Sequence, residues 1–303
     1  MRLRNFFVLA LIFVLPLLAV SAYADGLQGD GNYAVLAQSG ITNASAGGVL
    51  ATTINGDIGL SPIAATACTG FVPCDLGSGI VNGTANLTNA AAANAILAFS
   101  GATGSYNTLR ATGGAIAEGT ATLGTGGSLS SLAPGVYSFT GTGGVTNLLG
   151  TLTLAGDGNA NDTWIFEFLG SDTLITGTNS SVVVNGAGTG AGVYFVADQI
   201  TLGPDFVGAG NYLSGTSVTF ATGAQINCGR AFGQTAVTFA GSDPTAPNQI
   251  NQVSIDSCSA GTGGSTTGLN NGGGGTVSAP EPGTFAFLSC GLAFGLLMFR
   301  KLR

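Results

Sequence analysis

Threonines that are each followed by an apolar residue recur between Leu148 and Ala240. Three of the four steps between these pairs are 18 to 20 residues long, and the fourth is 28. In a strand, the apolar member would point inward and the threonine outward. A row of outward threonines presents hydroxyls that donate and accept hydrogen bonds beside methyls that exclude competing water, so its chemistry is the ordering of water. The pairs begin at Thr153, Thr173, Thr201, Thr219 and Thr238.

The spacing of these pairs indicates the element that must position them. A unit that recurs every 18 to 20 residues is typical of a solenoid, in which each coil stacks on the previous one at about 4.8 Å. The chain has 52 glycines and only 7% charged residues. Together with many β-branched residues, this composition favours short strands joined by glycine turns.

The charge of the chain excludes several classes of partner. Between residues 25 and 279, thirteen acidic residues are balanced by only two basic ones, Arg110 and Arg230, so this part has a net charge of −11. Binding to nucleic acid or to anionic lipid requires clustered lysines and arginines, which this part of the sequence lacks. We therefore expect no nucleic acid partner.

Catalysis has little chemical support in the sequence. A glycosidase needs two carboxylates close together, and a polysaccharide lyase needs a base and cations. The sequence contains no histidine, and its acidic residues are spread singly. An enzyme remains a third hypothesis, because Glu167, Asp198 and Asp205 could meet across coils. We predict no catalytic residue, no cofactor and no enzymatic activity.

Residues 157–162 place oxygen ligands at alternate positions, as the start of a calcium loop does. However, Asp162 stands where such a loop needs glycine, and Phe168 stands where it needs glutamate. The stretch also lies between two expected strands, where Asp, Asn and Gly are ordinary turn residues. We interpret it as a turn and predict no metal site.

The cysteines indicate disulfides rather than metal binding, because the chain has no histidine and no C-x-x-C motif. Cys68 and Cys74 flank a short loop and form one candidate pair. Cys228 and Cys258 are the other candidates, and Cys290 lies in the C-terminal segment. Four cysteines allow several connectivities, so the sequence alone does not choose between them.

Residues 1–24 are typical of a secretory signal peptide. Two arginines precede an apolar run from Phe6 to Val20, and a small-x-small cleavage site ends at Ala24. We expect the mature chain to begin at Asp25. The alternative is an uncleaved anchor helix.

The C-terminal segment, 280–303, has three parts in order: Pro280, Glu281 and Pro282, then an apolar run, then a basic cluster. This ending resembles the PEP-CTERM sorting signal of Gram-negative bacteria. The resemblance implies recognition by an exosortase, a transient inner-membrane anchor, cleavage near the Pro-Glu-Pro, and then secretion or display at the cell surface. The alternative is a permanent membrane tail. Residues 260–279, rich in Gly, Ser and Thr, read as a flexible linker before this signal.

One helix is expected beside the strands. Residues 90–99 contain six alanines and a leucine but no glycine or proline. Thr88 or Asn89 is the expected N-cap, and Gly101 would end the helix. We expect the helix to cover an apolar face of the solenoid. Its small residues on one side are Ala91, Ala95 and Ala98.

Several separate blocks of the sequence then resemble one family. They are YAVLAQSGITN from Tyr33, INGDIGLSPIAATACTGF from Ile54, LAPGVYSF from Leu132, LTLAGDGNANDTWIFEF from Leu152 and GAQINCGRAFGQTAVTF from Gly223. In this order they are similar to the DUF3494 ice-binding-like family. The resemblance implies a mainly β fold, a discontinuous right-handed β-solenoid of triangular cross-section with one long α-helix packed alongside. We assign residues 25–259 to this domain.

The ice face of that family often carries a Thr-Ala/Gly-x-Thr/Asn motif. Residues 176–179 match the motif fully, and residues 222–225 match only its first half. In the coil between them, residues 203–206 would break the row with a proline, a charge and a large ring, and the last coil has 241–243 in this place. The candidate ice-binding residues are Thr176, Thr178, Asn179, Thr201, Thr219, Thr222 and Thr238.

Two hypotheses about function follow. The first is a secreted, non-enzymatic protein that adsorbs to ice crystals through a flat threonine-rich face. The second, favoured by the sorting signal and the interrupted row, is an extracellular-matrix or adhesive surface protein that binds exopolysaccharide.

Overall fold

The computed structural model describes residues 27, 29–44, 52–72, 74–75, 77–140, 147–158, 162–169, 173–187, 191–241 and 247–252. The predicted signal peptide, linker and sorting signal all lie outside these residues. Among the helices of the described part, none has the length and apolar character needed to cross a membrane.

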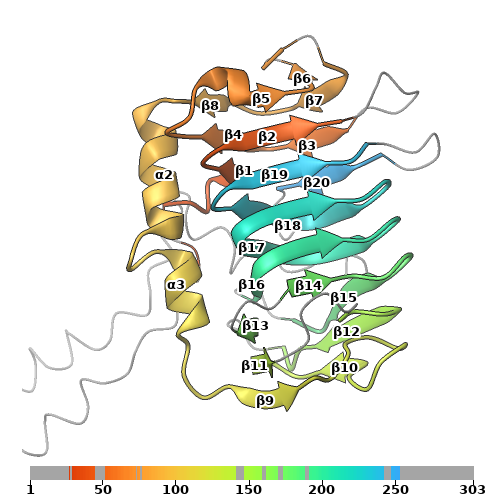
Figure 1. The fold of residues 1–303 in the computed structure, drawn as a ribbon. Coiled ribbons are helices and arrows are strands. Elements are labelled where there is room, and N and C mark those ends of the chain that lie inside the picture. The colour runs from red at the N-terminus through yellow and green to blue at the C-terminus, as the bar shows by residue number, and fades with distance from the viewer. Residues whose placement is uncertain are drawn as a thin grey trace, which may run out of the picture. The chain divides into compact units, whose positions relative to one another are not determined.

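The described chain is mainly β, as predicted, and its strands pair in parallel (Figure 1). Apolar and polar residues alternate along many strands, so that one side chain enters the core and the next faces out. The strands are β1 Tyr33–Ala37, β2 Gly40–Asn43, β3 Thr53–Asn55, β4 Asp57–Leu60, β5 Cys68–Thr69, β6 Phe71–Val72, β7 Gly79–Val81, β8 Ala85–Leu87, β9 Ile116–Gly119, β10 Ser131–Leu132, β11 Gly135–Thr140, β12 Thr151–Ala155, β13 Thr163–Leu169, β14 Thr173–Ile175, β15 Ser181–Asn185, β16 Gly192–Leu202, β17 Val207–Phe220, β18 Gln225–Gly233, β19 Ala236–Phe239 and β20 Gln249–Asn251.

The pairings form three parallel ladders. The helix-covered ladder runs through β8, β4, β1, β18, β17, β16, β13, β11 and β9. The threonine ladder runs through β5, β2, β19, β17, β16 and β14. The amide ladder runs through β7, β3, β20, β18, β17, β15, β12 and β10. The long strands β16 and β18 each take part in two ladders and β17 takes part in all three, so the coils visit the ladders in turn.

The order of the coils differs from the order of the sequence. The N-terminal strands β1, β2 and β3 pair with the C-terminal strands β18, β19 and β20. The chain then leaves β8 at one end of the stack, follows two helices along its side, and enters β9 at the other end (Figure 1). This arrangement makes the stack discontinuous, as the family resemblance implies.

The first of these helices, α2 (Ala90–Ser100), begins and ends as predicted. The side chain of Asn89 accepts a hydrogen bond from the Ala92 backbone N–H at 2.9 Å, and Gly101 is the C-cap. The predicted inward face of small residues was wrong in part, because the helix turns Ile96 and Phe99 inward and leaves Ala91 exposed. The buried residues of α2 are Ala92, Ala95, Ile96 and Phe99.

The second helix, α3 (Ser105–Arg110), was not predicted. It lies against β13, β16 and β17 of the helix-covered ladder. Arg110 forms an ion pair with Asp198 of β16, and Tyr106 donates a hydrogen bond to the same carboxylate at 3.0 Å. These contacts attach the helix to the sheet.

Aromatic rings fill the core between the ladders. Phe195 stacks on Phe166 with ring centroids 4.7 Å apart and on Tyr212 at 4.9 Å. All three rings lie on successive strands of the helix-covered ladder and point inward, so the stack follows the coils. The fully buried Trp164 donates its indole N–H to the Leu132 carbonyl at 3.1 Å.

The disulfide between Cys68 and Cys74 is confirmed. Cys228 is also disulfide-bonded. Its predicted partner, Cys258, lies outside the described residues.

Candidate functional site

The threonine ladder carries an outward row of threonines, which we call the threonine row. Thr201 lies opposite Thr219, and Thr219 lies opposite Thr238. The row then continues into N-terminal coils, where Thr238 lies opposite Thr42 and Thr42 opposite Thr69. Each of these side chains is half-buried between its neighbours above and below. The predicted alignment of Thr201, Thr219 and Thr238 in one outward row is therefore confirmed.

Small residues stand beside the threonine row on one side. Gly40, Ala236 and Ser217 lie opposite one another, two positions before the threonine of each coil. All three are half-buried. This flanking row therefore rises no higher than the threonines.

Alanines stand beside the threonine row on its other side. Backbone hydrogen bonds place Ala44, Ala240 and Ala221 on successive coils, just after the strands end. The face thus presents hydroxyls between two bands of small, mostly apolar groups. Such a surface excludes loosely held water between its methyls and fixes water at its hydroxyls.

Tight packing behind the threonine row makes the surface rigid. Ile41, Val237, Val218 and Ile200 have no exposed area and lie directly beneath it. The rings of Phe220 and Phe239 stack at 4.5 Å one position further on. Because interiors are close-packed, the outer rows keep the spacing of the coils.

Thr42 and Thr69 were missed by the sequence analysis, because they precede the repeated stretch. A three-residue pattern could have found Thr42. The strands at Gly40, Ala236, Ser217 and Gln199 all read as one residue, then a buried Ile or Val, then threonine. Nothing in the order of the sequence shows that the first of these coils stacks on the last.

Two of the repeated threonines lie elsewhere. Thr153 belongs to the amide ladder, where it lies opposite Val183 and Ser131. Thr173 lies on the threonine ladder but in the flanking row, opposite Gln199. The next residue of the threonine row after Thr201 is Ile175. The expectation that the five repeated threonines share one column was therefore wrong for two of them.

The four-residue motif at 176–179 forms a turn and not part of the flat face. Thr176 is only 3% exposed, and its hydroxyl oxygen accepts a hydrogen bond from the Gly203 backbone N–H at 2.7 Å. Thr176 is therefore not a surface residue. Thr178 and Asn179 are exposed in the turn itself, and Asn179 has a positive φ of 54°. Thr222 is exposed in the corresponding turn two coils away.

The predicted interruption by residues 203–206 was also wrong. Phe206 has no exposed area, and its ring packs edge-on against Tyr212 inside the core. Pro204 and Asp205 are exposed in the turn, outside the strand that carries Thr201. The threonine row is therefore continuous from Thr69 to Thr201. The strand register places residues 203–206 opposite 177–180, one position away from the alignment that predicted the interruption.

The acids proposed for an enzyme do not form an open pair. Glu167 is 3% exposed and faces α3, and burial raises the pKa of its carboxyl to about 7. Asp198 is occupied by Arg110 and Tyr106. Asp205 lies in an exposed turn. Within the described ranges, no cluster of three or more His, Cys, Asp or Glu side chains is placed to hold a metal ion.

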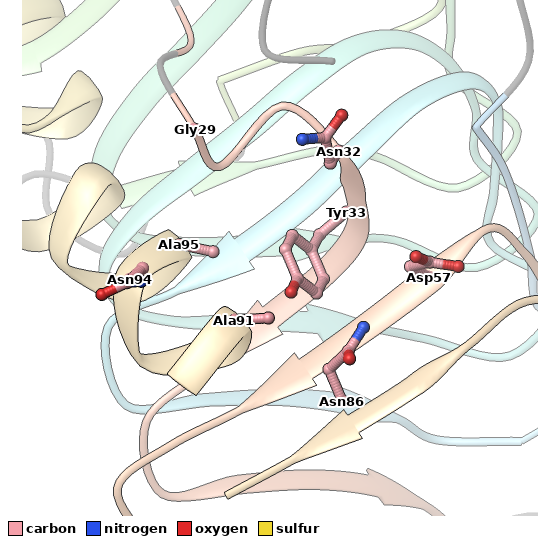
Figure 2. A pocket seen from close by; sticks show the side chains of 8 residues that line it. All are labelled: Gly29, Asn32, Tyr33, Asp57, Asn86, Ala91, Asn94 and Ala95. Carbon is pink, nitrogen blue, oxygen red and sulfur yellow. The ribbon is translucent and has the colours of Figure 1, made fainter. Parts of the chain in front are cut away.

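A hollow of about 480 Å³ lies between α2 and the strands β1, β4 and β8 (Figure 2). Figure 2 shows Tyr33, Asp57 and Asn86 directed toward its centre and the methyl of Ala91 on the helix side. One Asp57 oxygen already accepts a hydrogen bond from the Thr84 backbone N–H at 2.7 Å. The lining holds one carboxylate, that of Asp57.

Comparisons with known proteins agree on one family. A match to the family described as ice-binding-like covers residues 35–243. An ice-binding protein of Leucosporidium sp. (strain AY30) is 31% identical over 68% of this chain and 77% of its own length. An ice-binding protein of Nostoc sp. (strain HG1) is 42% identical over 104 residues, about a third of either chain. The crystal structure of the ice-binding protein from the Antarctic ascomycete Antarctomyces psychrotrophicus matches with a TM-score of 0.57 and 27% identity, over 74% of this chain and 95% of the other.

Proposed function

Because the chain belongs to the ice-binding-like family, we propose that it binds ice crystals through the outer face of its threonine ladder. The proposed surface consists of the threonine row with its two bands of small residues. The observation that carries the proposal is the continuous register of five threonines from separate coils, Thr69, Thr42, Thr238, Thr219 and Thr201.

Adsorption needs no reaction, and the described surface offers groups that suit it. Coils stack at about 4.8 Å, so the threonine hydroxyls recur at a fixed spacing and can hold an ordered layer of water. Release of loosely held water from the methyls beside them is thermodynamically favourable. The surface carries no charged side chain in its three rows, so no strongly hydrated group must be stripped of water.

We further propose that the three ladders are the sides of a right-handed solenoid of triangular cross-section. The support is that each coil visits three ladders in turn and that parallel crossover connections are right-handed in about 98% of cases. In this arrangement the two helices cover one side, and the threonine ladder is left open as a flat side.

Export is a separate proposal that rests on the sequence. The pattern of residues 1–24 supports secretion, and that of residues 280–303 supports sorting by an exosortase with a transient membrane anchor. Exopolysaccharide, the alternative ligand, gains no support from the threonine ladder, because its outer rows carry no aromatic ring on which a sugar could stack.

Thermal hysteresis and inhibition of ice recrystallisation test the proposed function. We expect activity from the wild-type protein and a large loss in Thr219→Tyr, whose ring would stand above the flat face. Thr153→Tyr is the matched control, because it places the same ring at a half-buried outward position on the amide ladder. Wild-type protein without effect on ice, or equal losses in both variants, would exclude this assignment.

A further inference from the structure

We propose that Gln199 limits the ice-binding surface to the coils that carry Thr219, Thr238, Thr42 and Thr69. This inference rests on the proposed function, and it names the residue that sets the extent of the same surface.

The position of Gln199 differs from those of its neighbours in the same row. It lies opposite Ser217 on one side and Thr173 on the other. The other members of the row toward the N-terminal coils are small, Ala236 and Gly40. Gln199 is exposed, whereas these neighbours are half-buried, so its long side chain extends above them.

The chemistry of this side chain opposes a flat contact with ice. The side chain of glutamine is two bonds longer than that of serine. Its carboxamide carries two hydrogen-bond donors and an acceptor, which bind water in many orientations. An ice layer that approached Thr201, two residues away, would have to order or displace this amide.

The next coil supports the same boundary. After Thr201 the threonine row has Ile175, whose side chain offers no hydroxyl to fix water. A hydroxyl and a small flanking residue occur together on the coils of Thr42, Thr238 and Thr219, and Thr69 completes the row at its far end. Thr201 therefore has the right hydroxyl but stands beside an obstructing side chain.

Gln199→Ser tests the inference, because it gives this coil the residue that Ser217 already provides on the next one. The change would add the coil of Thr201 to the four coils that already form the surface. We therefore expect thermal hysteresis to rise about 1.3- to 2-fold, in line with the larger contact area. A second variant, Gln199→Thr, should give a rise in the same direction. The matched control is Gln225→Ser, which shortens an outward glutamine on the amide ladder and should leave activity unchanged.

The outcomes separate this inference from the proposed function. If wild-type protein is active and Thr219→Tyr is impaired, but both Gln199 variants are unchanged or weaker, the amide helps or is neutral and the inference is wrong. If wild-type protein has no activity at all, the proposed function itself fails. Equal gains from Gln199→Ser and Gln225→Ser would also overturn the inference, because the effect would then not depend on the face.

Discussion

Thr42 and Thr238 lie opposite one another in the parallel register of β2 and β19, although they stand near opposite ends of the described chain. The buried side chains next to them, Ile41 and Val237, are paired in the same register. The proposed ice-binding surface therefore contains a junction between N-terminal and C-terminal coils. Closing this junction requires long-range pairing, which forms late compared with local contacts.

We predict that Thr42→Tyr reduces thermal hysteresis as strongly as Thr238→Tyr. Both changes place a ring on neighbouring coils of the threonine row, so each should prevent ice from contacting the coils around it. Circular dichroism melting curves of both variants should stay close to wild type, since the two side chains face solvent and surface changes usually alter stability by about 0.5 kcal/mol or less. Unchanged thermal hysteresis in Thr42→Tyr would contradict this prediction and would show that the surface contains only the C-terminal coils.

The disulfide next to Thr69 should also affect activity. Cys68 is buried directly beside Thr69 and is bonded to Cys74, and the loop between them is further held by Asp75, which accepts hydrogen bonds from the Gly70 and Gly77 backbone N–H groups at 2.8 Å. We predict that the double change Cys68→Ser, Cys74→Ser lowers thermal hysteresis moderately, because Thr69 is the last residue of the row and would lose its fixed position.

This disulfide prediction can be checked against its own control. Measured unfolding should show a loss on the order of 2 kcal/mol, since removing a disulfide that closes a short loop has this effect. Combining the double change with Thr69→Tyr should cause little further loss of activity if the disulfide acts through Thr69. Full additivity of the two changes would argue against that route.

The strands of this fold were more predictable than their neighbours in space. Alternating patterns in single segments, such as Thr-Leu-Thr-Leu at 151–154, indicate strands because the information is local. The cap at Asn89 was predictable for the same reason. The stacking of β2 on β19 was not, because it depends on the path of α2 and α3 along the stack.

The site was predicted in part for a related reason. Strand positions Thr201, Thr219 and Thr238 keep their register, so counting along the chain found them. The turn from Ile175 to Ser181 is as long as the turn from Thr201 to Val207, so the comparison of 176–179 with 203–206 was shifted by one residue and aligned residues that do not share a face. Thr176 turns inward to bond Gly203, and Phe206 enters the core. Gln199 was not predicted as part of the surface, because the flanking row is defined only by the pairing of strands from separate coils.

The aromatic stack in the core should dominate stability without contributing to the surface. Phe195 has no exposed area and stacks on both Phe166 and Tyr212. We predict that Phe195→Ala lowers the free energy of unfolding by about 3–5 kcal/mol, the usual cost of removing a buried ring. Phe195→Leu should lose less, about 1–2 kcal/mol, because it keeps most of the volume. Denaturant unfolding measures both, and equal losses would contradict a role for the ring.

Glu167 should make the stability of the protein depend on pH. Its carboxyl is buried beneath α3, and one of its oxygens, Oε1, has no hydrogen-bond partner. Burial raises the pKa of the group from 4.5 to about 7, although the nearby Arg110 acts in the opposite direction. Between these two values the folded state therefore holds a proton that the unfolded state has released, so stability falls as pH rises from about 4.5 through 7 and then levels off.

The change Glu167→Gln removes this titration while keeping the shape of the side chain. We predict that wild type loses on the order of 1–3 kcal/mol between pH 4.5 and pH 8 relative to the variant, so that the variant is the more stable protein at pH 8 and about equal at pH 4.5. Urea unfolding across this range measures the difference, with Gln225→Ser as a reference that alters no ionisable group. Parallel pH curves for wild type and Glu167→Gln would show that the Glu167 carboxyl titrates alike in the folded and unfolded states, which would contradict the prediction.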